Sequence, residues 1–96
     1  MNVRWLRKAA ANLEREYQWL YERSPTAAQN FATEVYELTS LLAAQPAMGR
    51  PGRVMGTREL MLRNFPYLLP YRVKNNEVQI LRVSHTYREP PKEKYA

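Results

Sequence analysis

The spacing of apolar residues along the first half of the chain predicts a short strand followed by two helices. Residues 1–5 alternate as a strand does. From there the apolar side chains recur every three or four positions, which is typical of a helix with one buried face. The first apolar stripe consists of Leu6, Ala9, Leu13, Tyr17 and Leu20, and the second of Ala28, Phe31, Val35, Leu38 and Leu42.

The junction between the two stripes carries the signals of helix boundaries. Ser24 is a favourable N-cap, Pro25 is a favourable first residue of a helix, and Pro46 ends the second helix. Because the connection at residues 22–24 is short, we expect the helices to run antiparallel, as a hairpin over residues 6–45.

The second half of the chain has the pattern of strands. A loop rich in Pro and Gly at residues 45–56 precedes them. The sequence then predicts an antiparallel meander over residues 57–84, with its three strands at residues 57–63, 67–74 and 77–83.

Two features inside the meander bear on its hydrogen bonding. Asn75 and Asn76 tolerate the positive φ angles of a tight hairpin turn between the last two strands. Pro70 has no N–H to donate to a neighbouring strand, so we expect it at a sheet edge or beside a bulge.

Together these elements predict an α+β fold in a single domain over residues 1–96. The helical hairpin would pack on one face of a small antiparallel sheet and leave the other face partly open. The functional surface is expected on that open face. Residues 89–96 contain two prolines and several charges and are expected to form a loose tail.

Charge and cysteine content narrow the class of protein. The formal net charge is +6, and all of this excess lies in residues 50–96. Such asymmetry suits an acidic protein or a nucleic acid as partner, although a merely solubilising surface would look the same. The chain has no cysteine and no apolar run near the roughly 20 residues of a membrane helix, which favours a reducing cytoplasm.

No cofactor or metal site is expected. The phosphate-binding glycine loop and the nucleophile elbow of hydrolases are both absent from the sequence. His85 is the only histidine, so no pair of histidine or cysteine ligands with a metal-binding spacing exists.

The C-terminal half contains a series of short motifs: GRPGR at 49–53, GTREL at 56–60, PY at 66–67, YRV at 71–73 and ILRVSH at 80–85, followed by Arg88. In this order they resemble the RelE/ParE superfamily of bacterial toxins, and more closely its ParE-like branch. The resemblance implies a toxin of a type II toxin–antitoxin system, neutralised by a cognate antitoxin protein. ParE-like members poison DNA gyrase, whereas RelE-like members cut messenger RNA in the ribosome, so two mechanisms stay open.

The gyrase alternative requires binding and no catalysis by the toxin itself. The antitoxin or the target would then be bound by a set of basic side chains, namely Arg50, Arg53, Arg58, Arg63, Arg72, Arg82, His85 and Arg88.

The ribonuclease alternative requires a base, an acid and cations around a phosphate. Glu59 and His85 are the available base and acid, and Arg58, Arg72 and Arg82 are the available cations. Glu59 could equally be a carboxylate paired with a neighbouring arginine, and His85 a hydrogen-bonded residue at a strand end.

One departure from the RelE pattern weighs against catalysis. RelE-like enzymes place an arginine directly after the tyrosine of the third strand, whereas here Tyr67 is followed by Leu68. Leucine cannot stabilise the charge of a pentavalent phosphorus. Tyr87 could replace the C-terminal tyrosine of the cutting enzymes, or could simply pack.

A third alternative is a basic nucleic-acid-binding domain without toxin activity.

Overall fold

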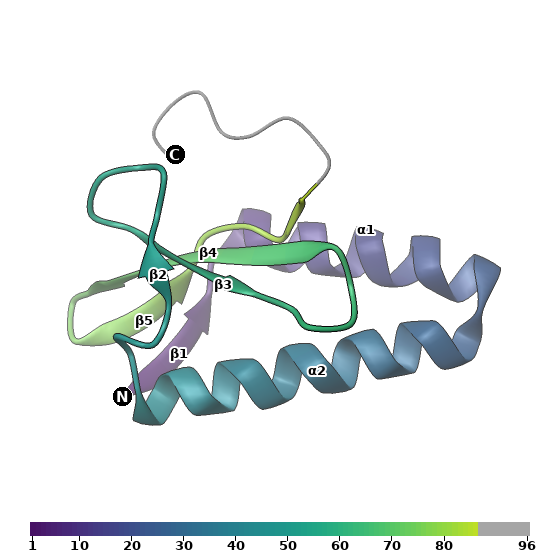
Figure 1. Ribbon diagram of the computed structural model, residues 1–96, viewed down its shortest axis with the longest axis horizontal. Coiled ribbons are helices and arrows are strands. Elements are labelled where there is room, and N and C mark those ends of the chain that lie inside the picture. The colour runs from purple at the N-terminus through teal and green to yellow at the C-terminus, as the bar shows by residue number, and fades with distance from the viewer. Residues whose placement is uncertain (87–96) are drawn as a thin grey trace.

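The computed structural model describes residues 1–86 and arranges two helices along one side of a sheet (Figure 1). The predicted tail, Tyr87 and Arg88 lie outside the described residues. The elements are β1 (Asn2–Trp5), α1 (Arg7–Arg23), α2 (Pro25–Ala44), β2 (Arg50–Pro51), β3 (Arg58–Met61), β4 (Tyr67–Lys74), β5 (Glu77–Ile80) and β6 (Ser84–His85).

The helical hairpin forms as predicted, with a connection even shorter than expected. Ser24 alone separates α1 from α2. Its backbone N–H donates to the Leu20 carbonyl at 2.7 Å, which closes α1, and its hydroxyl accepts from the Ala27 N–H at 3.2 Å, which caps α2. One residue therefore serves as the C-cap of one helix and the N-cap of the next, and the two helices lie side by side and antiparallel (Figure 1).

The sheet has the order β1-β5-β4-β3-β2, and β6 pairs with β4. The predicted meander of β3, β4 and β5 is antiparallel. Strand β1, however, pairs with β5 in parallel, with Val3 opposite Val78, so the sheet as a whole is mixed. The long connection through the helical hairpin lets β1 lie beside the last long strand in the same direction.

The turn residues Asn75 and Asn76, together with Pro70, determine how β4 pairs with its neighbouring strands. Asn75 and Asn76 have φ angles of 55° and 58°, as a tight hairpin requires. Pro70 is not at an edge, because β4 has neighbours on both sides. The Pro70 carbonyl accepts from the Leu81 N–H at 2.8 Å. The N–H that proline lacks would point to the same side of β4, and on that side the ladder is interrupted between β5 and β6.

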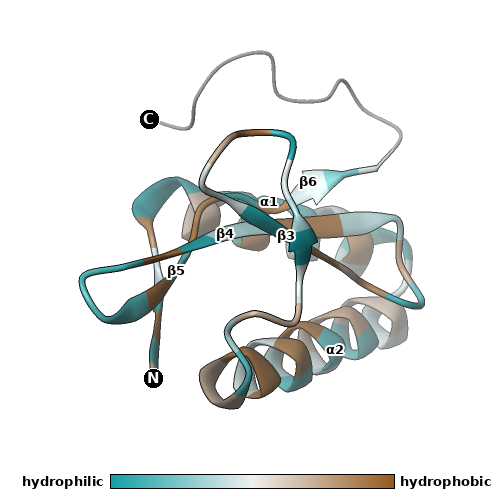
Figure 2. Cartoon of the chain, turned by 60° about the vertical axis from the view of Figure 1, so that its left-hand side comes forward, coloured by the Kyte–Doolittle hydropathy of each residue, from teal (hydrophilic) through white to brown (hydrophobic). Residues whose placement is uncertain are grey.

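The core lies between the helices and the sheet. Phe31 of α2 is fully buried, and its ring centre lies 5.0 Å from that of Tyr67 and 5.6 Å from that of Phe65. Helix α2 contributes most of its predicted stripe to this core, whereas in α1 Leu13 and Tyr17 are only partly buried. Figure 2 shows that β3, β4 and β5 carry both hydrophilic and hydrophobic positions along their length, as strands with two different faces do.

Replacing the shared cap should destabilise the hairpin. For Ser24→Ala we expect the free energy of unfolding to fall by about 1 kcal/mol, because the Ala27 N–H loses its acceptor. Urea unfolding followed by circular dichroism measures this. Ser40→Ala, in the exposed interior of α2, is the matched control and should be neutral or slightly stabilising. Equal effects of the two changes would contradict the role of the cap.

Candidate functional site

The sheet register places the candidate base and the candidate acid on opposite faces. Glu59 pairs with Pro70, and the neighbouring pair of Leu60 with Leu69 belongs to the core under the helices. Because successive side chains of a strand alternate, Glu59 lies on the face away from the helices. His85 pairs with Tyr67, which is a core residue, so His85 lies on the helix side.

Glu59 is held by the loop that precedes β3. Its side chain is buried, and one carboxylate oxygen accepts from Arg50 Nη2 at 3.2 Å. The other accepts from the backbone N–H of Arg53 at 3.1 Å and lies 3.7 Å from Arg53 Nε. Both guanidinium groups remain substantially exposed. The geometry matches a structural carboxylate that holds two arginines at the surface.

Arg58 also has structural partners, on the other face of β3. Its Nη1 donates to the carbonyl oxygens of Gly49 at 2.8 Å and Ala47 at 3.3 Å. The neighbouring hydroxyl of Tyr71 donates to the Pro46 carbonyl at 2.7 Å and accepts from the Gly49 N–H at 2.8 Å. Burial raises the pKa of Tyr71 above its usual 10.0, and the Gly49 hydrogen bond and the Arg58 charge oppose this shift. These bonds fix the segment after α2.

His85 packs against Tyr67, which is hydrogen-bonded to a buried acid that the sequence analysis missed. The His85 and Tyr67 rings meet edge to face, with their centres 5.2 Å apart. The Tyr67 hydroxyl donates to Glu16 Oε1 at 2.9 Å, and Glu16 is only 2% exposed. The sequence did carry a signal, because Glu16 interrupts the apolar stripe of α1 seven residues after Ala9 and four before Leu20.

Arg72 belongs to a row of polar side chains across the face away from the helices. Its Nε donates to Gln79 Oε1 at 2.8 Å, and Gln79 Nε2 donates to Glu77 Oε1 at 3.1 Å. Arg4 Nη1 reaches the same Glu77 oxygen at 3.5 Å. The row therefore crosses three neighbouring strands, β4, β5 and β1. Gln79, which is only 3% exposed, was not predicted as a site residue.

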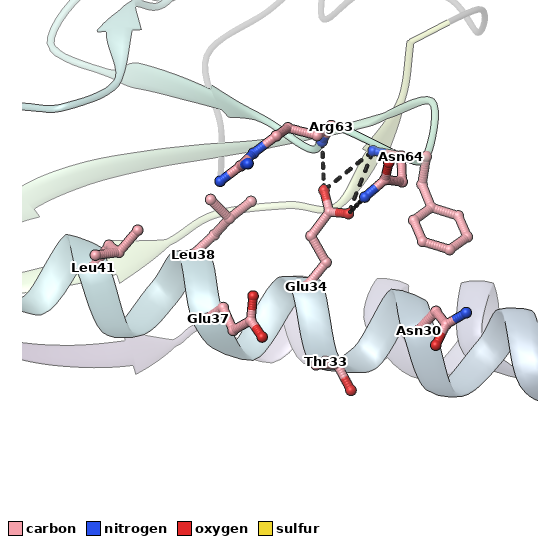
Figure 3. Close-up of a pocket in the computed structure, with 9 residues that line it drawn as sticks. Asn30, Thr33, Glu34, Glu37, Leu38, Leu41, Arg63 and Asn64 are labelled. Atoms are coloured by element: carbon pink, nitrogen blue, oxygen red, sulfur yellow. Dashed lines mark hydrogen bonds between the residues drawn. The ribbon is translucent and has the colours of Figure 1, made fainter.

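Arg63 lies in the turn between β3 and β4, and its role differs from that of the other arginines. Its backbone N–H and that of Asn64 donate to the Glu34 carboxylate of α2, and Asn64 Nδ2 donates to it at 2.8 Å (Figure 3). The Arg63 side chain extends over α2 toward Leu38 instead of turning to Glu34 (Figure 3). Glu34 thus ties the turn to the helix and leaves the guanidinium at the surface.

Leu68 and Arg82 complete the candidate set. Leu68 is 3% exposed and pairs with Met61 and Ser84, so the position of the RelE arginine is filled by a buried apolar side chain. Arg82 is half-buried between β5 and β6 and donates to the Leu81 carbonyl at 2.7 Å.

The structure therefore brings Arg50, Arg53 and Glu59 together and Arg72 onto the same face, whereas Arg58 and His85 lie on the other. Arg88 lies outside the described residues. Within residues 1–86, no group of three His, Cys, Asp or Glu side chains is placed to hold a metal ion. No helix in this part of the chain has the length and apolar character needed to cross a membrane.

Comparison with known proteins agrees with this architecture. Residues 3–90 match the family described as the ParE toxin of the type II toxin–antitoxin system parDE. The Y4kP protein of Sinorhizobium fredii, whose name marks it as a toxin candidate, is 36% identical over 89 residues, which cover 93% of this chain and 92% of that protein. A solved structure of a chromosomal ParDE system from P. aeruginosa matches with a TM-score of 0.78 and 36% identity, over 88% of this chain and 95% of that one.

A two-helix hairpin packed on a mixed sheet is the architecture of this class of protein, the toxins of the RelE/ParE superfamily. The chain belongs to the ParE toxin family of type II toxin–antitoxin systems.

If Glu59 is structural, removing its charge should cost stability. For Glu59→Gln we expect the free energy of unfolding to fall by about 1–3 kcal/mol, because a buried acceptor of two hydrogen bonds and partner of two guanidinium groups loses its charge, and an amide N–H₂ then faces those groups. Urea unfolding measures the change. Glu22→Gln, at an exposed position of α1, is the control and should stay within about 0.5 kcal/mol of the wild type. A fully stable Glu59→Gln variant would contradict this role.

Proposed function

We propose that this ParE-family toxin arrests growth by binding DNA gyrase and stabilising its cleaved-DNA state, without covalent chemistry of its own. The observation that carries the proposal is the separation of Glu59 and His85 by the sheet. A general base and a general acid must both reach one reacting phosphate. Side chains on opposite faces of a sheet, three residues apart in register along β4, do not converge on one.

Two further observations support binding over RNA cleavage. The position of the RelE arginine is occupied by buried Leu68, which supplies no positive charge. Glu59 is already engaged by Arg50 and by the backbone of Arg53. Both carboxylate oxygens therefore already accept from donors of the protein itself.

A binding protein can poison an enzyme without catalysing a reaction. It needs only a higher affinity for one state of the target's cycle, and a difference of about 1–3 kcal/mol shifts the population substantially. Arginines whose guanidinium groups lie at the surface, such as Arg50 and Arg53, can supply contacts of this kind. The proposed target places the toxin in the cytoplasm, where a cognate antitoxin would neutralise it by covering the same surface.

The test measures cleaved DNA in a purified system. Toxin, gyrase, ATP and supercoiled plasmid are mixed, and linear DNA is counted after protein digestion. We expect linear DNA to accumulate with the wild type and with His85→Ala, and to fall roughly tenfold with Arg72→Glu, which reverses a charge on the face away from the helices.

The control for the charge reversal is Arg4→Gln, which removes an exposed arginine from the same face. It should retain most of the activity. If no cleaved complexes accumulate, and gyrase supercoils normally with excess folded toxin, gyrase is not the target, although membership of the family would stand.

A further inference from the structure

A hydrogen bond fixes one edge of the Arg72 guanidinium, and the other edge has no partner among the described residues. Its Nε donates to Gln79 Oε1 at 2.8 Å, and Gln79 is itself buried and fixed by its bond to Glu77. Within residues 1–86, the two terminal nitrogens of Arg72 have no hydrogen-bond or ion-pair partner. A guanidinium held in this way presents its remaining donors in a fixed direction.

The positive charge of Arg72 is not neutralised by the acids near it. Glu77 is separated from Arg72 by Gln79 and pairs with Arg4 instead. The ion pairs among the described residues involve Arg4, Arg15, Arg50 and Arg53, and Arg72 is not among them. A half-buried and uncompensated arginine beside a hollow is suited to an external anion.

A hollow of about 300 Å³ adjoins this guanidinium. Its walls combine cationic and apolar side chains, and they are formed by Val54, Met55, Gly56, Thr57, Arg72, Val73, Lys74 and Leu81. Met55 is 95% exposed at the tip of its loop. Such a wall offers apolar contact directly beside two positive charges.

The loop that forms one wall of the hollow is ordered by its own hydrogen bonds. Gly52 N–H donates to the Thr57 carbonyl at 2.8 Å, and the Thr57 hydroxyl donates to the Val54 carbonyl at 2.6 Å. Gly56 adopts a φ of 81°, which side-chain-bearing residues rarely take. The wall is thus formed before any ligand arrives, which lowers the cost of binding.

We propose that this hollow binds a carboxylate side chain of the antitoxin, with an adjacent apolar side chain of the same segment against Met55 of the loop. The inference rests on the proposed function in taking the antitoxin as the partner. Two parallel N–H donors on the free edge of Arg72 match the two oxygens of a carboxylate. A polypeptide suits the site better than a nucleic acid, because only Arg72 and Lys74 contribute charge and apolar side chains complete the walls.

Gln79 is a positioning residue in this account. It does not face the ligand but fixes the rotation of the guanidinium through its contact with Nε. Gln79→Met keeps a similar volume and removes that acceptor, so it should weaken antitoxin binding less than loss of Arg72 itself. Arg72→Lys keeps the positive charge and loses the planar pair of donors.

The experiment measures the affinity of the toxin for the antitoxin encoded beside it. Toxin variants are recovered from the co-expressed complex, refolded and titrated with the antitoxin by calorimetry. We expect Arg72→Gln to weaken binding roughly tenfold or more, and Arg72→Lys and Gln79→Met to weaken it by smaller factors. Arg7→Gln removes an exposed arginine of α1 that has no ion pair among the described residues, and as the matched control it should stay within about twofold.

A second titration separates the hollow from general effects of charge and folding. Thermal unfolding must give each variant a transition like that of the wild type, and a short labelled DNA duplex replaces the antitoxin. Wild-type affinity of Arg72→Gln for the antitoxin would overturn the inference and leave the gyrase proposal standing. A loss confined to DNA binding would also overturn it, by assigning the hollow to phosphate. An antitoxin that fails to bind the wild type would overturn the inference and the assigned partner together.

Discussion

Strand β4 is hydrogen-bonded on both sides, and its alternation of side chains determines where every candidate residue lies. On one side it pairs with β3, and on the other with β5 and then β6. Tyr67, Leu69 and Tyr71 face the helices, so Leu68, Pro70 and Arg72 face away. The residues paired with them inherit the same division. The chemistry available on each face follows from this one strand.

The buried carboxylates Glu59 and Glu16 lie on different faces of the sheet, and each has a structural role there. On one face, Glu59 joins β3 to the loop that carries Arg50 and Arg53. On the other, Glu16 joins α1 to Tyr67 of β4. A buried carboxylate is costly unless it is paired or hydrogen-bonded, and both are. Arg50 and Arg53, whose guanidinium groups are exposed, belong to the surface to which we assign partner binding.

Much of the fold could be predicted from the sequence, because the signals were local. The bounds of β4, the cap at Ser24 and the Asn75–Asn76 turn depend on residues close together in the chain. Strands β2 and β6 have only two residues each and exist through pairing with β3 and β4, so no periodicity could reveal them.

The arrangement of the site was less predictable. The face on which His85 lies depends on the register of β6 against β4, and a shift of one residue would reverse it. The place of Gln79 opposite Arg72 could have been inferred, because the turn at Asn75–Asn76 sets the register of the two strands. Glu16 was detectable in principle, since a carboxylate within an apolar stripe needs a buried partner.

The central proposal is that Glu59 and His85, which lie on opposite faces of the sheet, do not act as an acid–base pair. The most direct measurement adds purified, folded toxin to translating ribosomes and maps messenger RNA ends by primer extension, with a ribosome-dependent ribonuclease as positive control. We expect no codon-dependent cuts above background for the wild type. Clear cuts that His85→Ala or Glu59→Ala abolishes, in variants that remain folded, would contradict it.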